Sequence, residues 1–269
     1  MDHSSDLVWK DLNLTVDDVH VTVSTIRREG SLPDPLLILH GFGGTKEDYL
    51  DVALVKALSG VPVILYDTPG SGQSACQDLS KLSIPFLATL AEEVLRHYGV
   101  KKFHLMGHSM GGLTALMLAQ KRPDAVLSFV NIKGNLAPED CFLSRQVLQH
   151  PSDCPEAFFG QFVERTRRSR QFGNGVYAAG LRAKVRPEIV RPTFESMVLL
   201  SDTEDLLRIF LALPCPKMFM YGEQYSDLSY LERLQQEGVE LAEIPHAGHF
   251  VMYSNPVEMW RRVAAFLKT

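Results

Sequence analysis

Short apolar runs alternate with amphipathic stretches along most of this chain. The runs have the length of strands and contain few polar residues, which is typical of strands buried on both faces of a sheet. The stretches between them repeat apolar residues at helical spacing. This alternation predicts a mostly parallel sheet with helices on both faces. The predicted buried strands are residues 36–39, 61–66, 103–106, 126–130 and 218–221.

Both ends of the chain also carry clear element signals. Residues 19–23 alternate between apolar and polar, which predicts a half-exposed, antiparallel edge strand. Pro256 directly follows Asn255, a typical helix start, and begins the last predicted helix. Helices are expected over residues 84–98, 109–120 and 256–267.

The alternation stops between residues 135 and 203, where short helical pieces are separated by Pro and Gly. A stretch of this length is too long for a plain connecting loop. We interpret it as a helical cap insertion. The predicted organisation is therefore one core, made of residues 1–134 and 204–269, interrupted by a cap at 135–203.

Composition narrows the function classes. Hydrophobic residues at 45% and charged residues at 22% are ordinary globular values, and a net charge of -5 without a long Lys/Arg run argues against nucleic acid as a partner. Residues 1–6 are polar and acidic, and no stretch of about 18 apolar residues occurs. We therefore expect a cytoplasmic protein without a membrane span.

Cysteine and histidine spacing gives no sign of a metal or a disulfide framework. The four cysteines include no C-x-x-C pair, and a core of this size needs no cross-links. We expect reduced thiols, with Cys141 inert. No cluster of His, Cys and carboxylates has ligand spacing, so neither a metal nor another cofactor is predicted.

The most specific motif is the sequence GHSMGG at residues 107–112, which follows a predicted strand and opens a predicted helix. A strand that turns sharply into a helix exposes the serine between them, and glycines at the flanking positions let the backbones approach each other. The amides at the start of the helix then point toward the reacting group. Ser109 is the predicted nucleophile.

A second loop follows the first buried strand, with the sequence HGFGG at residues 40–44. Ligands bind at the carboxyl edge of an open α/β sheet, where this loop and Ser109 both lie. We predict that the backbone amides of Phe42 and Met110 form an oxyanion hole. Asp67, in a Pro- and Gly-rich turn on the same edge, is expected to hold its turn by accepting backbone hydrogen bonds.

The predicted general base lies in the loop with the sequence IPHAGHF, between the last strand pattern and the last helix. A histidine there can reach over the strand ends to Ser109, and its near-neutral pKa suits proton transfer in both directions. His249 is the predicted base, and His246 is expected to be a surface or supporting residue. His108 is expected to pack beneath the turn.

With these segments in place, the chain resembles the α/β-hydrolase superfamily over residues 35–135 and 206–269. The matching motifs are HGFGG, YDTPGSGQS, GHSMGG and IPHAGHF, in the order found in the family. The resemblance implies an eight-stranded sheet, a helical cap and hydrolytic chemistry, with the chain order nucleophile, acid, histidine.

The sequence departs from the family at the acid of the catalytic triad. Tyr225 stands where most members carry the acid, and Lys133 stands at the alternative place after the preceding strand. Asp227, in the same loop as Tyr225, is our first candidate for the acid. Glu139 or Asp140 could serve instead, or no carboxylate at all. A lysine close to His249 would disfavour its protonated form.

The predicted cap offers both apolar and basic side chains. Its aromatic residues could line an apolar pocket over Ser109, and residues 164–191 carry a local charge of +6 that could attract an acidic substrate, although such charges usually form a solvated helix face. The aromatic and apolar candidates are Phe158, Phe159, Phe162, Phe172, Tyr177, Phe194 and Met197.

We interpret the protein as a serine hydrolase acting on a small, apolar or aromatic ester, thioester or related acyl compound. Two alternatives stay open. The same Ser-His pair could catalyse carbon-carbon bond cleavage or a cyclisation, or the protein could be a ligand-binding receptor without catalysis.

Overall fold

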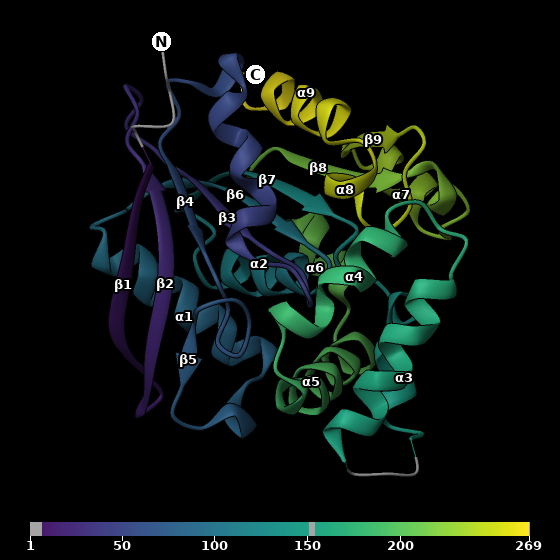
Figure 1. Cartoon of the computed structure of the whole chain (residues 1–269). Helices are drawn as coiled ribbons and strands as arrows, with labels where there is room; N and C mark the ends of the chain where they lie inside the picture. Colours follow the sequence, from purple (N-terminus) through teal and green to yellow (C-terminus); the bar gives the residue numbers. More distant parts are fainter. Residues whose placement is uncertain (1–6, 151–153, 269) are drawn as a thin grey trace.

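The computed structural model describes residues 7–150 and 154–268. A single sheet lies between layers of helices, with α1, α2 and α6 on one side and α9 on the other (Figure 1). The strand order is β1-β2-β4-β3-β6-β7-β8-β9, and every neighbouring pair from β4 to β9 is parallel. The predicted fold class is confirmed. The central strands are β3 (Leu36–Leu39), β4 (Val63–Tyr66), β6 (Phe103–His108), β7 (Val126–Ile132), β8 (Lys217–Gly222) and β9 (Glu240–Ile244).

The amino-terminal strands differ from the prediction. Residues 19–23 belong to β2 (Val19–Arg28), which is antiparallel as expected, but the edge is formed by β1 (Leu7–Val16), which pairs with all ten residues of β2. The two strands meet at Asp17 and Asp18, both at positive φ, the geometry of a tight two-residue hairpin. β1 is mostly exposed and therefore lacked an apolar signal. A two-residue strand, β5 (Ala75–Cys76), also pairs with β2 and adds a ninth strand to the eight of the main path.

Two of the helices that cover the sheet, α1 and α9, begin at side-chain caps. Ser83 accepts a hydrogen bond from the amide of Phe86 at the start of α1, and Asn255 accepts one from Glu258 at the start of α9, as the Asn255-Pro256 pair predicted. The bounds of these helices are α1 Ile84–His97, α2 Met110–Lys121, α6 Leu206–Ala212, α7 Leu231–Gln236, α8 Val251–Ser254 and α9 Pro256–Phe266.

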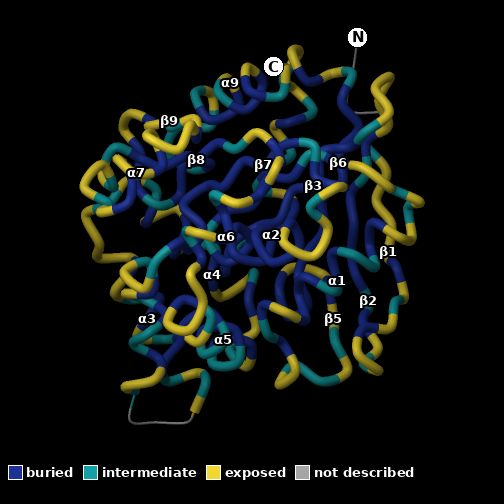
Figure 2. The backbone as a smooth tube through the Cα atoms, turned by 180° about the vertical axis from the view of Figure 1, so that it is seen from behind, coloured by how far each residue is buried: buried dark blue, intermediate teal, exposed yellow. Residues whose placement is uncertain are grey.

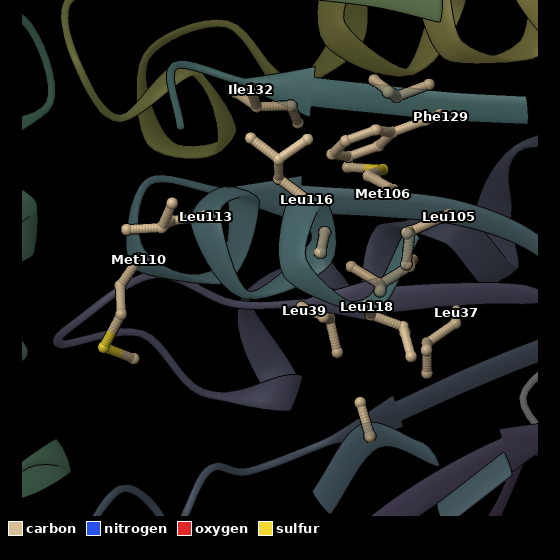
Figure 3. Close-up of a cluster of buried hydrophobic side chains, with 14 of the residues drawn as sticks. Leu37, Leu39, Leu105, Met106, Met110, Leu113, Leu116, Leu118, Phe129 and Ile132 are labelled. Atoms are coloured by element: carbon tan, nitrogen blue, oxygen red, sulfur yellow. The ribbon is translucent and has the colours of Figure 1, made fainter. Parts of the chain in front are cut away.

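The helix α2 lies deep in the core. This helix is buried along ten of its twelve residues, and Figure 2 shows α2, β3 and β6 as mainly buried. In Figure 3 its side chains meet those of β3, β6 and β7, so the helix that follows Ser109 is fixed against the sheet. The labelled residues are Met110, Leu113, Leu116 and Leu118 of α2 with Leu37, Leu39, Leu105, Met106, Phe129 and Ile132 of the strands.

Between β7 and α6 the described residues form helices without a sheet strand, as the broken alternation predicted. These helices gather on one side of the molecule (Figure 1). We call them the helical segment; the domain limits at 135 and 203 stay predictions. Pro151 and the acidic residues 1–6 lie outside the described residues. The helical segment contains η5 Pro138–Cys141, η6 Ser144–Val147, α3 Pro155–Arg168, α4 Asn174–Lys184, η7 Pro187–Ile189 and α5 Val190–Thr203.

No helix in the two described ranges is both long and apolar enough to span a bilayer. The four cysteines, all within those ranges, form no disulfide with one another.

Candidate active site

Ser109 occupies a strained turn between β6 and α2. Its backbone has φ 52° and ψ -118°, outside the regions that side-chain-bearing residues usually adopt. Its amide donates to the Ile132 carbonyl of the neighbouring strand (2.9 Å), and its carbonyl accepts from Leu113 (3.0 Å). Such strain persists only where the surroundings enforce it, and it is common at functional sites. The turn has the form predicted for a nucleophile.

The glycines around Ser109 are required by close backbone approach. A Cβ at Gly107 would lie 2.4 Å from the carbonyl oxygen of Gly111. At Gly111 it would lie 2.3 Å from the Leu39 carbonyl at the end of β3. These contacts bring the start of α2 against the loop that follows β3, so the two backbone segments predicted to bind an oxyanion are neighbours.

The loop after β3 is held from two sides. His40 Nε2 accepts a hydrogen bond from the amide of Thr68 (2.9 Å), and the Phe42 carbonyl accepts one from the Tyr177 hydroxyl of α4 (2.8 Å). Neither the Phe42 amide nor the Met110 amide donates to another backbone group of the described chain. Both N–H groups therefore retain the capacity that an oxyanion hole requires.

Asp67 has the structural role that the sequence predicted. Its buried carboxylate accepts hydrogen bonds from the backbone amides of Lys46 (2.8 Å) and Gln73 (2.9 Å), and it pairs with the Lys46 ammonium (2.7 Å). The prediction that Asp67 fixes its turn is confirmed.

His249 lies in the loop after β9, which packs closely on the end of β8. A Cβ at Gly222 would lie 2.3 Å from the carbonyl oxygens of both Ala247 and Gly248, so the glycine permits this contact. The ring of His108, beside the nucleophile, donates from Nε2 to the His249 carbonyl (2.9 Å). His108 is buried, as expected, and it ties the loop of the predicted base to the turn of the predicted nucleophile. His246 is largely exposed.

The surroundings of His249 keep its imidazole neutral. Its ring lies 4.9 Å from the ring of His108 and 6.0 Å from that of Tyr225, measured between centroids. Burial, together with the nearby His108 and Lys133, lowers the pKa of His249 well below its usual value. Burial likewise lowers the pKa of His108 to about 4. A neutral imidazole is the form that can accept a proton from serine.

Ser109 and His249 line the same cavity. No hydrogen bond joins the two side chains, both of which the structure describes. Such bonds often tighten only in the complex with substrate. The structure thus brings together the predicted nucleophile and base, whose chemical roles stay predictions. The apolar part of the lining is Phe42, Phe142, Leu143, Phe162, Phe194, Met197 and Phe250, and the polar part includes Lys133, Asn135, Asp140, Gln171, Asn174 and Tyr225.

At the place of the missing acid the cavity holds a buried ion pair. Lys133, in the turn after β7 and at φ 46°, donates from Nζ to Asp140 Oδ1 (2.5 Å), and both side chains are at most 5% exposed. The ring of Tyr225 faces the ammonium, with Nζ 5.0 Å from the ring centroid. A cation-aromatic contact and a salt bridge thus occupy both positions where the family usually carries its acid.

None of the three candidate acids bonds to His249 in the described chain. Asp140 accepts from the amides of Leu136 and Ala137 and from the Tyr230 hydroxyl, besides Lys133. The other two lie away from the cavity lining: Glu139 accepts from Ser229, and Asp227 is exposed. The position of Asp227 therefore gives its predicted role no support.

Asn174, at the first turn of α4, is a site residue that the sequence did not reveal. It lines the cavity and is only 6% exposed, yet its Oδ1 has no hydrogen-bond partner in the described chain. Asn135 also lines the cavity, but its amide donates to Cys141 Sγ (3.0 Å) and Ser201 Oγ (3.1 Å). A buried polar atom without a partner costs stability, which is a reason to expect a ligand for it. Only the folding of α4 against the sheet edge identifies Asn174.

Within residues 7–150 and 154–268, no group of three or more His, Cys, Asp or Glu side chains is placed to hold a metal ion.

Comparison with known proteins assigns this arrangement to a family. The model of the family described as alpha/beta hydrolase fold matches residues 34–172, more than half of the chain. The chain belongs to the α/β-hydrolase family. Among solved structures, the fold is similar to that of a carboxylesterase of Nitrososphaera gargenis, which is 19% identical, with a TM-score of 0.75 and coverage of 96% of this chain and 98% of that one.

Curated relatives of this α/β-hydrolase differ in the activities for which they are named. The dihydrolipoyllysine-residue acetyltransferase component of the acetoin cleaving system of Pseudomonas putida is 26% identical over 87% of this chain and 63% of its own. The pimeloyl-[acyl-carrier protein] methyl ester esterase of Aeromonas salmonicida is 32% identical over 51% of this chain and 49% of its own. The chain thus spans between about half and 63% of the length of these two relatives.

Proposed function

We propose that this α/β-hydrolase is a serine hydrolase that cleaves a carboxylic ester, a thioester or a related acyl compound. The observation that carries the proposal is Ser109, held at positive φ between β6 and α2 in the cavity that His249 also lines. A serine hydroxyl becomes nucleophilic when a nearby imidazole takes its proton. The relative named as a methyl ester esterase supports ester chemistry.

In the proposed reaction Ser109 Oγ attacks the acyl carbonyl carbon while His249 takes the hydroxyl proton. The amides of Phe42 and Met110 donate to the negatively charged oxygen of the tetrahedral intermediate. When the intermediate collapses, the bond to the leaving group breaks and the leaving group takes the proton from His249. Water then attacks the acyl-serine by the same steps, which releases the acid and returns the proton to Ser109.

In this proposal His249 acts without a hydrogen-bonded carboxylate. A triad acid stabilises the imidazolium and fixes the tautomer of the ring. Here the hydrogen bond from His108 to the His249 carbonyl fixes the loop, and the flanking rings of Phe250 and Tyr225 restrict the imidazole. The imidazolium is less stable in such a site, so we expect slower turnover than in a triad enzyme.

We further propose that the helical segment is a cap that binds the acyl or alcohol part of the substrate. Phe162 of α3 and Phe194 of α5 pack edge-to-face against Phe42, with centroid distances of 5.9 and 4.7 Å. These three rings form an apolar wall beside Ser109. An aliphatic or aromatic group of the substrate would bury its surface there.

Covalent labelling tests the proposal. A fluorophosphonate should label the folded protein once, and peptide mapping should place the label on Ser109. Ser109→Ala should abolish labelling, whereas Ser144→Ala, which removes another serine hydroxyl from the same cavity, should not. Failure of the folded wild-type protein to react, or a label on a different residue, would contradict the assignment of Ser109 as nucleophile.

A further inference from the structure

Lys133 is the only lysine or arginine among the described residues that line the cavity. The basic residues that give the helical segment its local charge lie elsewhere: Arg165, Arg167 and Arg168 of α3 are exposed. Lys133 instead comes from the sheet edge and is 5% exposed. An ammonium is kept this deeply buried only when its hydrogen bonds are satisfied, because desolvation of the charge is costly.

The protein supplies Lys133 with one acceptor for three N–H donors. In the described chain that acceptor is Asp140 Oδ1, and the Tyr225 ring offers only its face. Two donors thus have no acceptor from the described residues, and Lys133 lines the cavity that holds Ser109. The missing acceptor has to come from the contents of the cavity.

Asp140, in contrast to Lys133, has its hydrogen-bonding capacity filled by the protein. Its carboxylate accepts from Lys133, from two backbone amides and from the Tyr230 hydroxyl, so its oxygens have four donors at 2.5 to 3.2 Å. A carboxylate with this many donors has little capacity left for a ligand. The ion pair is therefore asymmetric: its cation can still bind a partner, whereas its anion is satisfied.

We propose that Lys133 is a substrate-binding residue that recognises a carboxylate, so the preferred substrates are acyl compounds with a second, anionic group. This inference rests on the proposed function and specifies the substrate class for the same site. Lys133 places an ammonium at one of the two positions where members of the family carry an acid, which favours negative charge in the substrate. The apolar wall of Phe42, Phe162 and Phe194 would then bind the chain between the two ends of the molecule.

Matched substrates that differ in charge test the proposal. Monomethyl adipate and methyl 6-oxoheptanoate have the same shape, but the second carries an acetyl group in place of the carboxylate. Hydrolysis at pH 7, followed by chromatography, should favour monomethyl adipate in kcat/KM by about 10- to 100-fold, the usual worth of a hydrogen bond to a charged group. Monomethyl succinate and glutarate, with their own ketone analogues, cover shorter distances.

Variants test whether Lys133 causes the preference for the charged substrate. Lys133→Met alone leaves Asp140 buried without its cation and could unfold the protein, so the decisive variant combines Lys133→Met with Asp140→Asn. In that double variant the ratio of the two kcat/KM values should fall to about 1, and Lys133→Arg should preserve a ratio above 1. The matched control is Lys184→Met, which breaks a similar lysine-aspartate pair (Lys184 with Asp48, 2.5 Å) outside the cavity lining and should keep the preference.

Two outcomes separate this inference from the proposed function. Turnover through Ser109 with equal rates on charged and neutral esters in the whole series would overturn the role of Lys133 and leave the hydrolase intact. Absence of turnover and labelling would overturn the hydrolase, and binding would still test Lys133. Calorimetry of Ser109→Ala with monomethyl adipate should show binding that the added Lys133→Met and Asp140→Asn changes weaken at least about tenfold; equal binding would contradict the proposal.

Discussion

The two sides of the cavity differ in how closely they match a site for acyl transfer. On one side, Ser109 and the loop of Phe42 keep the backbone geometry that acyl transfer needs, with strain at φ 52° and close backbone contacts at Gly107 and Gly111. On the other side, beyond β7 and β8, the charge is reversed, because Lys133 and Tyr225 stand where an acid would be.

The backbone geometry and the charges of such a site can therefore change independently of each other. The nucleophile depends on a steric arrangement that admits almost no substitution, whereas the partner of His249 depends on side chains alone. The consequence is a base without a hydrogen-bonded acid, in a cavity that is also lined by the cation Lys133.

The largest effect is expected on the side of the cavity that keeps the backbone geometry for acyl transfer. His249→Gln removes the base and should lower kcat by at least about 10⁴-fold on any ester that the wild type hydrolyses, while the fold is retained by circular dichroism. His246→Gln, an exposed change in the same loop, serves as its control and should change kcat by less than about twofold. A small effect of His249→Gln would contradict the proposal that Ser109 and His249 catalyse the reaction together.

Asn174 is the residue of the helical segment whose replacement is expected to have the next largest effect. Asn174→Leu should lower kcat/KM by about 10- to 100-fold if its carboxamide positions the substrate. The same change removes an unpartnered buried oxygen, so the melting temperature should rise by about 2–4 °C. The matched change Asn135→Leu breaks two hydrogen bonds and should lower the melting temperature. Lower stability of Asn174→Leu would indicate a structural role instead.

The reversed charge should be visible in the pH dependence. His249 must be neutral to act, and burial, His108 and Lys133 lower its pKa, so kcat/KM should stay on its plateau below pH 6.5 and fall only at more acidic pH. Replacing Lys133 by Met together with Asp140→Asn removes one of these causes, so the fall should begin at a higher pH. Lys184→Met should leave the profile in place; an identical shift there would mean that Lys133 has no specific influence.

The lowered pKa of His249 also makes the stability of the protein depend on pH. The unfolded chain takes up a proton at His249 near pH 6.5, whereas the folded chain does not. The contribution of His249 to stability is therefore complete above that pH and is lost progressively as the pH falls toward the folded pKa. His249→Gln should make the free energy of unfolding depend less on pH in a urea-unfolding series measured between pH 7 and pH 5.

The smallest effect is expected at the predicted acid. Asp227→Asn should leave kcat within about threefold of wild type, because the carboxylate is exposed and makes no contact with His249 in the described chain. A loss of about 10³-fold or more would instead make Asp227 the acid of a triad and would contradict a base that acts without a carboxylate.

Much of the fold could be predicted from the sequence. Five buried strands, the helices α1, α2 and α9, and the antiparallel direction of β2 follow from apolar periodicity and from start signals such as Asn255-Pro256. β1 could not be predicted, since most of its side chains are exposed and only its pairing with β2 makes it a strand. Periodicity reports burial, and an exposed strand has none to report.

The turn at Ser109 could be predicted from the sequence, because the steric demand of that turn falls on Gly107 and Gly111, two residues away on either side. The sequence also predicted that His249 lies at the same edge of the sheet as Ser109. The charge of the site, in contrast, depends on tertiary contacts. Asp140 meets Lys133 and Tyr230, 90 residues further along the chain, and Asn174 reaches the cavity because α4 packs on the loop of Phe42. Backbone turns are specified locally, whereas the partners of a buried charge come from whatever segments the fold brings together.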